Sequence, residues 1–238
     1  RSTDSGENWL TATLPTPPPY VVAIAVSPEY ESDGLVFAAT MEDGVFRSWD
    51  RGASWAAWNF GLLDLNVYAL VISPDFGRDE TLYVGTESGI FSSTNGGRAW
   101  REVPFAMEAA PVLSLALSPG YGADGILLAG TEASGLFRSA DRGASWQRVY
   151  EWDGDSAVNQ LVVANTGSGS WVLMALAGTS VSYSRDGGSH WRSLPAAASM
   201  DAAPTCICAP QGLAAGEPLL LGLEDGRVIL AEIPDWQA

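Results

Sequence analysis

The chain has 238 residues, and 12 arginines against 28 acidic residues give it a formal net charge of −16. This charge repels phosphate backbones and anionic lipid surfaces, which argues against nucleic-acid binding and membrane association. The sequence contains no lysine, which excludes Schiff-base and P-loop chemistry because both require that amine. Apolar residues make up 47% of the chain, enough for a substantial core. The apolar runs 21–26 and 67–72 are too short to cross a bilayer, so no membrane insertion is predicted.

An eight-residue pattern, Ser-x-Asp-x-Gly-x-x-Trp, occurs five times at nearly constant spacing. Its copies begin at Ser2, Ser48, Ser93, Ser139 and Ser184, which are 46, 45, 46 and 45 residues apart. A repeat of this length indicates stacked copies of one supersecondary unit. We call each copy a box, and the third box carries Asn95 where the others carry Asp.

Three short strands are predicted before the box in each repeat, in the same order. The first is an apolar run that ends at Ser-Pro, as at 23–28, because proline cannot donate to a sheet ladder. A polar turn follows, carrying Asp33, Asp79 or Asp124. A fourth strand opens at the box tryptophan, so each repeat predicts one four-stranded antiparallel blade. In the first three repeats the second strands are predicted at 35–40, 81–86 and 126–131, and the third strands at 45–48, 90–93 and 136–139.

The last repeats and the chain ends complete this prediction. The fifth repeat has strands at 205–210, 218–223 and 228–233, but its box is degraded around Trp236. The C-terminus therefore lacks a fourth strand, whereas the N-terminus supplies one at 9–14 without the three that should precede it.

Pairing these two ends would remove exposed sheet edges. We therefore predict an all-β fold: one five-bladed β-propeller domain over residues 1–238, its ring closed by the N-terminal strand joining the C-terminal blade. The alternative is a piece of a larger ring. The predicted blades cover 20–60, 67–104, 112–150, 157–195, and 204–234 together with 1–14.

The boxes are interpreted as rigid turns between third and fourth strands. Ser and Asp side chains bond backbone N–H groups a few residues on, Gly supplies a positive φ, and Trp packs between neighbouring sheets. Asn95 keeps the hydrogen bonding without the charge, which favours a structural role over a catalytic one. The residues assigned to this structural role are Asp4, Trp9, Asp50, Trp55, Asn95, Trp100, Asp141, Trp146, Asp186 and Trp191.

The box is similar to the Asp-box, or bacterial neuraminidase repeat. That motif occurs in sialidases, xyloglucan-degrading glycoside hydrolases, sortilin-type receptors and photosystem II assembly factors. The longer unit at 118–146 resembles the repeats of bacterial extracellular or photosystem-assembly propellers. This resemblance covers nearly the whole chain and implies a propeller, but these families share the box while doing different things. The assembly factors imply a basic patch on a seven-bladed ring, whereas this chain is acidic.

An enzyme is not predicted. Sialidases imply three clustered arginines and six blades, whereas Arg47 and Arg138 follow the repeat and five blades are expected. His190 is the only histidine and is interpreted as a turn residue of the fifth box. Glycosidases need two carboxylates roughly 5–10 Å apart, and 28 acidic residues make such a pair possible by chance. A glycoside hydrolase is therefore the least favoured alternative, and no cofactor or metal is predicted.

The two cysteines, Cys206 and Cys208, lie on one face of a predicted strand. Their Cα atoms should be roughly 6.5–7 Å apart, at or beyond the disulfide range. They align with Leu70 and Ile72, so we predict that both are buried apolar side chains.

A binding site is predicted on the face made by the turns between second and third strands and by the connections between blades. The turns carry acidic residues and the connections carry aromatic ones. This face suits a cationic peptide segment, a divalent cation, or a sugar stacked on Trp58 or Trp152. The predicted ligand-binding residues are Glu42, Asp43, Glu87, Glu132, Glu224, Asp225, Trp58 and Trp152.

The sequence thus predicts a non-enzymatic scaffold that binds a protein partner, either extracellular or within an assembly. A lectin-like carbohydrate binder is the alternative. The first residue is Arg1 rather than Met, which leaves processing and secretion open. The compartment and the oligomeric state are not predicted.

Overall fold

The structure is a computed structural model that describes residues 1–15, 17–105, 111–149, 156–165, 171–194, 201–210, 212 and 218–231. It divides into two compact units, Arg1–Met107 and Glu108–Ala238. We call them unit 1 and unit 2.

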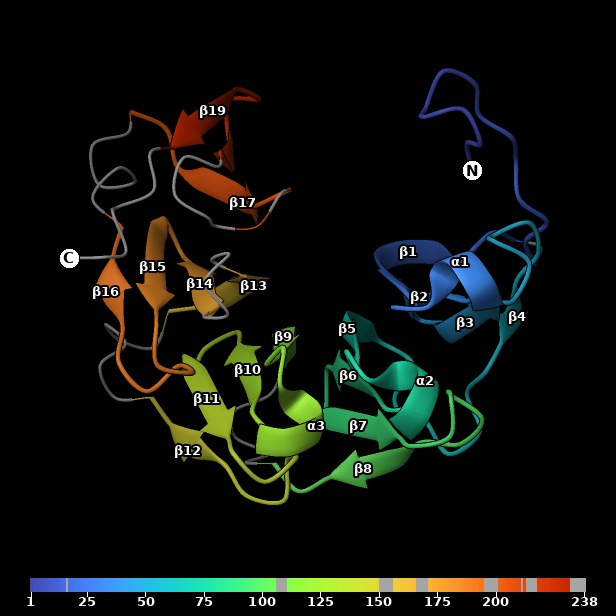
Figure 1. Cartoon of the computed structure of the whole chain (residues 1–238), viewed down its shortest axis with the longest axis horizontal. Helices are drawn as coiled ribbons and strands as arrows, with labels where there is room; N and C mark the ends of the chain where they lie inside the picture. Colours follow the sequence, from blue (N-terminus) through green and yellow to red (C-terminus); the bar gives the residue numbers. More distant parts are fainter. Residues whose placement is uncertain are drawn as a thin grey trace. The chain divides into compact units, whose positions relative to one another are not determined.

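Unit 1 contains two antiparallel sheets of four strands, each paired in chain order (Figure 1). The first sheet has β1 (Tyr20–Val26), β2 (Val36–Met41), β3 (Gly44–Ser48) and β4 (Ala56–Ala57). The second has β5 (Val67–Ile72), β6 (Leu82–Thr86), β7 (Ile90–Ser93) and β8 (Arg101–Val103). Two short helices, α1 (Tyr30–Asp33) and α2 (Phe76–Asp79), connect the first and second strands.

Unit 2 contains the third, fourth and fifth sheets, again paired in chain order. The third sheet has β9 (Val112–Leu117), β10 (Leu127–Thr131), β11 (Leu136–Ser139) and β12 (Gln147–Arg148), with α3 (Tyr121–Asp124) after β9. The fourth has β13 (Val158–Asn165), β14 (Trp171–Ala177), β15 (Ser180–Ser184) and β16 (Arg192–Ser193). The fifth has β17 (Pro204–Cys208), β18 (Leu219–Leu223) and β19 (Val228–Ala231). The predicted all-β, five-bladed β-propeller fold is confirmed, each sheet being one blade.

The pairing of the N-terminal strand with the C-terminal blade stays a prediction, and within unit 1 the N-terminal segment contacts the first sheet. The described part of the fifth sheet has three strands, with β18 in the middle. Residues 9–14 form no strand. Instead, Thr13 donates its N–H to the Ala53 carbonyl at 2.8 Å and makes a parallel bridge with Ser54. The backbone of Thr13 is therefore already bonded within unit 1, at the box of the first sheet.

The polar turns that follow the first strands are one-turn helices. In each, an aspartate at the helix end accepts the hydroxyl of the serine that ends the preceding apolar run. The oxygen–oxygen distances are 2.6 Å for Ser27 with Asp33, 2.7 Å for Ser73 with Asp79, and 2.6 Å for Ser118 with Asp124. Asp33 also accepts the N–H of Leu35 at 2.8 Å. These aspartates tie the start of the second strand to the end of the first.

Within each unit, successive sheets pack face to face, because alternate residues of a strand point to opposite faces. In unit 1, Ala25 and Phe37 of the first sheet pack with Leu70 and Leu82 of the second. In unit 2, Met174 and Val162 of the fourth sheet pack with Ile207 and Leu221 of the fifth. We call the face that meets the next sheet in chain order the leading face, and the opposite one the following face.

A register shift occurs at the same place in the first strand of every sheet. The residue left out of the pairing is Val22, Tyr68, Leu113, Asn159 or Thr205. These positions align the five sheets residue by residue, and they place Cys206 with Ala69 and Ile207 with Leu70.

The prediction that both cysteines are buried is therefore wrong. Cys206 and Cys208 are exposed, whereas Ile207 between them is only 2% exposed. The prediction aligned Cys206 with Leu70, which is one residue away from the alignment given by the paired strands. A shift of one residue moves every side chain of a strand to the opposite face of the sheet.

Candidate functional site

In unit 1, the predicted acidic turns are held together by the connection from β4 to β5. Glu42 and Asp43 form the β2–β3 turn, and Glu87 begins the β6–β7 turn. The connection bonds both turns: Gly44 donates its N–H to the Leu65 carbonyl at 3.0 Å, and Glu87 donates its N–H to the Asn66 carbonyl at 3.2 Å. Residues 58–66 thus form one surface with the two turns, which we call the turn face.

Two asparagine side chains strengthen this link. Asn59 donates from Nδ2 to the Asp43 carbonyl at 2.8 Å and accepts the N–H of Val45 at 2.8 Å. Asn66 donates from Nδ2 to Oε2 of Glu87 at 2.7 Å. The side chains of Glu42, Asp43 and Glu87 remain exposed, so their carboxylates are open to a partner.

Asp64 is a further carboxylate on this face that sequence reasoning missed. Its Oδ2 accepts the N–H of Ser88 at 2.7 Å and its Oδ1 accepts the N–H of Asn66 at 3.0 Å. Partial burial raises the pKa of Asp64, but hydrogen bonds from Ser88, Asn66 and Thr86 together outweigh it and lower the pKa below its ordinary value. Asp64 is therefore a fixed negative charge. The only sequence signal was an Asp two residues before Asn66, which is typical of a side-chain turn.

The same connection displays two apolar side chains to solvent. Phe60 is 79% exposed and Leu63 is 82% exposed. Their backbone is anchored: the Phe60 carbonyl accepts the Trp100 N–H at 2.8 Å, and Leu62 between them is buried. An anchored loop that presents an aromatic and an aliphatic side chain beside carboxylates is suited to protein contact.

Of the two predicted aromatic binding residues, Trp58 and Trp152, the first lies within the described part of the chain. Trp58 is half-buried, and the guanidinium carbon of Arg47 lies 4.4 Å from its ring centroid. Arg47 also donates from Nη1 to the Gly96 carbonyl at 3.1 Å. One face of the Trp58 ring is therefore occupied by a cation. Trp152 lies outside the described residues.

The predicted acidic turn residues of unit 2 are also exposed. Glu132 follows β10, and its N–H bonds the Pro111 carbonyl at 3.0 Å. Glu224 accepts the N–H of Ala203 at 3.3 Å. Asp225 accepts the N–H of Arg227 at 3.0 Å and its Nε at 2.7 Å, and these bonds lower the pKa of Asp225. Its charge is already partly balanced within the turn.

The box side chains make the local hydrogen bonds of a rigid turn. In the first sheet, Ser48 Oγ donates to Asp50 at 2.8 Å and accepts the Gly52 N–H at 2.8 Å, while Asp50 accepts the Ser54 N–H at 2.8 Å. Hydrogen bonds from Ser54 lower the pKa of Asp50 to about 2. The same pattern lowers the pKa of Asp4 to about 2, through the hydroxyl of Ser2 above all.

The other boxes repeat this geometry with small differences. Asn95 uses its side-chain oxygen to accept the Ala99 N–H at 2.9 Å, so an uncharged group makes the same bond. In the fifth box, burial raises the pKa of Asp186, but bonds from His190 and Ser184 lower it to about 2 overall. His190 lies 2.5 Å from Asp186 through Nδ1 and is exposed. The tryptophans Trp9, Trp100 and Trp191 each donate Nε1 to a backbone carbonyl at 2.7–3.1 Å.

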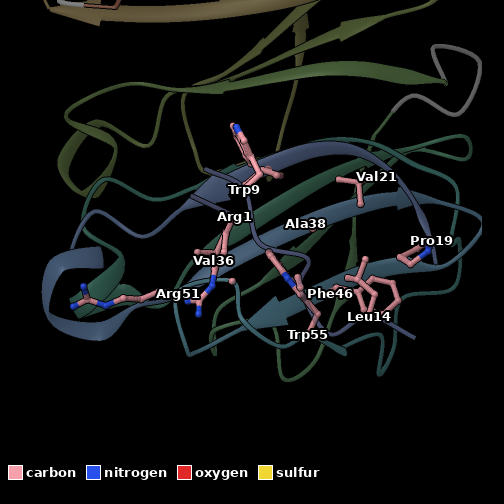
Figure 2. Close-up of a pocket in the computed structure, with 13 residues that line it drawn as sticks. Arg1, Trp9, Leu14, Pro19, Val21, Val36, Ala38, Phe46, Arg51 and Trp55 are labelled. Carbon is pink, nitrogen blue, oxygen red and sulfur yellow. The ribbon is translucent and has the colours of Figure 1, made fainter. Parts of the chain in front are cut away.

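An apolar groove that the sequence did not predict lies on the following face of the first sheet. Its volume is about 370 Å³. Figure 2 shows its floor of Val36, Ala38 and Phe46 and, from the N-terminal segment, Trp9 and Leu14. The match between 23–28 and 69–74 could have identified the floor positions, but not the groove that lies over them.

Other kinds of site find no support in the described residues. Over these ranges, His, Cys, Asp and Glu side chains form no group of three or more that could hold a metal ion. None of the helices described has the length and hydrophobicity needed to span a membrane.

Comparison with known proteins gives structural likeness alone. The chain matches no protein-family model and no curated protein sequence. YCF48 from Cyanidioschyzon merolae superposes with a TM-score of 0.64 at 15% identity, covering 97% of this chain and 75% of that one. A structure of YCF48 bound to D1 peptide superposes with a TM-score of 0.65 at 16% identity, covering 97% of this chain and 70% of that one.

A GH74 xyloglucanase from Xanthomonas campestris is also similar, with a TM-score of 0.60 at 22% identity and 89% of this chain covered. The chain spans 37% of the length of that enzyme. At 15–22% identity these likenesses show the fold alone. The chain has the fold of these proteins, and its function has to be argued from its own surface.

Proposed function

We propose that this protein is a non-catalytic binding propeller whose turn face in unit 1 recognises a cationic protein segment. The observation that carries the proposal is the exposed pair Phe60 and Leu63 on an anchored connection beside carboxylates. An apolar anchor within a rim of charge is the usual composition of a protein-binding surface.

The electrostatics support a basic partner. Glu42, Asp43 and Glu87 are exposed around the connection, and Asp64 is held ionised by its hydrogen bonds. A chain with a net charge of −16 attracts a basic segment over several ångströms before contact. The likeness to a YCF48 structure that holds a D1 peptide adds that this fold can carry a peptide site.

A peptide array tests the proposal against its alternatives. Peptides rich in arginine and leucine should bind, whereas counterparts with glutamate in place of arginine should not. Binding should be lost in a double variant, Asp43→Asn with Glu87→Gln, and kept in the control Glu102→Gln. Glu102 is an exposed carboxylate on the outer strand β8.

Two results would overturn the proposal. One is binding on a glycan array that Trp58→Ala abolishes, which would favour a carbohydrate binder. The other is release of reducing sugar from xyloglucan that a single carboxylate variant abolishes, which would establish a hydrolase like the similar GH74 enzyme.

A further inference from the structure

The connection that carries Phe60 is held by one residue of the second box. Trp100 donates its indole Nε1–H to the Trp58 carbonyl at 2.7 Å, and it donates its backbone N–H to the Phe60 carbonyl at 2.8 Å. Its side chain is 3% exposed and packs in the core of unit 1. Both ends of the segment 58–60 are therefore bonded to a residue that is itself fixed by the core.

Trp100 uses its indole differently from two other box tryptophans. Nε1 of Trp9 donates to the Gly6 carbonyl, and Nε1 of Trp191 donates to the Gly188 carbonyl, each within its own box. The carbonyl that Trp100 reaches lies 42 residues earlier in the chain, on the connection from β4 to β5. The indole of Trp100 therefore acts on the turn face and not on its own box.

Gly61 allows the connection to pass close to Trp100. Its φ is +80°, a conformation that favours glycine, and a Cβ added there would collide with the Trp100 carbonyl oxygen. The next residue, Leu62, is buried and donates its N–H to the Asn59 carbonyl at 2.9 Å. With Leu62 turned into the core, Phe60 and Leu63 on either side of it are left in solvent.

We infer that Trp100 positions Phe60 for binding, and that the segment taken by the turn face must carry a large apolar side chain beside its arginine. The inference rests on the proposed function and adds the apolar part of the partner to it. The side chains of Phe60 and Leu63 have no polar group, so apolar surface is what they can recognise. Holding them in place before binding lowers the entropy lost when the partner docks.

Gly61→Ala disturbs this arrangement without removing any side-chain group. The new Cβ has to push the connection away from Trp100, and because Gly61 is exposed the variant should keep the wild-type circular dichroism. The matched control is Gly226→Ala, in an exposed turn with a φ of +86°. Among the described residues, only its chain neighbours come within 4 Å of a Cβ added there, so the control has the backbone strain without the collision.

Trp100→Phe tests the indole bond itself. It keeps an aromatic ring in the core and removes the donor to the Trp58 carbonyl. The matched control is Trp191→Phe, which removes the bond to Gly188 inside the box of the fourth sheet. Both variants are compared at a temperature where circular dichroism shows them folded.

Hydrogen exchange of the free protein measures whether Trp100 holds the connection, without any ligand. The amide of Leu62, which bonds the Asn59 carbonyl, should exchange at least about tenfold faster in Gly61→Ala and Trp100→Phe than in the wild type. The two controls should leave its exchange rate unchanged. Unchanged exchange in Gly61→Ala and Trp100→Phe would overturn the inference and leave the proposed function standing.

Fluorescence anisotropy with two peptides measures the effect on recognition. The wild type should bind an arginine- and leucine-rich peptide about tenfold more tightly than its counterpart with alanine in place of leucine. This preference should fall below about threefold in Gly61→Ala and Trp100→Phe, while the salt dependence stays, since the carboxylates are intact. Adding Trp100→Phe to Phe60→Ala should cause no further loss, because Trp100 acts through Phe60.

The outcomes separate this inference from the function on which it rests. Binding of neither peptide by the wild type would overturn both. Binding with the same leucine preference in the wild type, Gly61→Ala and Trp100→Phe would overturn the inference alone. So would losses from Phe60→Ala and Trp100→Phe that add in the double variant, because Trp100 would then act on binding independently of Phe60.

Discussion

Ile24 and Leu70 occupy the same position in the first strands of consecutive sheets, yet 62% of Ile24 is exposed and only 8% of Leu70. Leu70 packs against the first sheet, whereas Ile24 faces the groove. The same side-chain chemistry therefore stabilises the fold at one position and forms a surface at the other.

This difference predicts unequal costs of truncation. Leu70→Ala should lower the free energy of unfolding by about 2–5 kcal/mol, because it leaves a cavity between two sheets. Ile24→Ala should cost less than about 1 kcal/mol, because the side chain is already in water. Urea unfolding at low protein concentration measures both. Equal losses would contradict the exposed position of Ile24.

Arg47 is predicted to fasten the two sheets of unit 1 through its contacts with Trp58 and the Gly96 carbonyl. Arg47→Met removes the stacked cation and the hydrogen bond, which should cost about 1–3 kcal/mol of stability. The control is Arg78→Met, since the side chain of Arg78 is 86% exposed. The melting temperatures of both variants are compared with that of the wild type. If Arg47→Met lowers the melting temperature no more than Arg78→Met does, Arg47 does not link the two sheets.

Gln160 is predicted to link the fourth and fifth sheets of unit 2, as Arg47 links the two sheets of unit 1. Its Nε2 donates to the Ile207 carbonyl at 2.9 Å, and its Oε1 accepts the Ile207 N–H at 2.7 Å. Gln160→Ala leaves both backbone groups without this partner and should cost about 1–3 kcal/mol. Gln147→Ala, on the exposed strand β12, is the matched control. Chemical unfolding measures the stability of both variants. Equal free energies of unfolding for Gln160→Ala and Gln147→Ala would contradict a stabilising link through Gln160.

Much of the fold was predictable from the sequence because the strands and turns of each repeat are determined by residues that are close together in the chain. Apolar runs ending at Ser-Pro became β1, β5 and β9, and the boxes became hydrogen-bonded turns. What failed depended on pairing. The bulge at Thr205, which places Cys206 with Ala69, appears only when the strands are paired.

The site was predictable in part, for the same reason. The acidic turns could be found from repeat spacing, and they are exposed as turns usually are. The contribution of Asp64 depends on a bond to Ser88, 24 residues away, and no local pattern encodes it. Nor does the sequence distinguish Ile24, which lines the groove, from Leu70, which packs in the core of unit 1, since the two look alike.

The box aspartates predict how stability changes in acid. The pKa of Asp50 is about 2 in the folded chain against an ordinary 3.8, so the folded state favours the ionised form. This contribution to stability is complete above about pH 4 and is lost as the pH falls toward 2. Asp50→Asn, which copies the natural Asn95, should weaken the fall of melting temperature over this range. A pH profile as steep as that of the wild type would contradict it.

The dissociation constant of an arginine- and leucine-rich peptide, measured by fluorescence anisotropy, tests the central claim most directly. The measurement compares the wild type with Asp43→Asn/Glu87→Gln and with Glu102→Gln, at about 0.05 and about 0.5 M NaCl. We predict that the double variant binds about 3- to 30-fold more weakly than the wild type and depends less on salt. Equal affinities for all three proteins, or no binding by the wild type, would contradict a protein-binding role for the turn face.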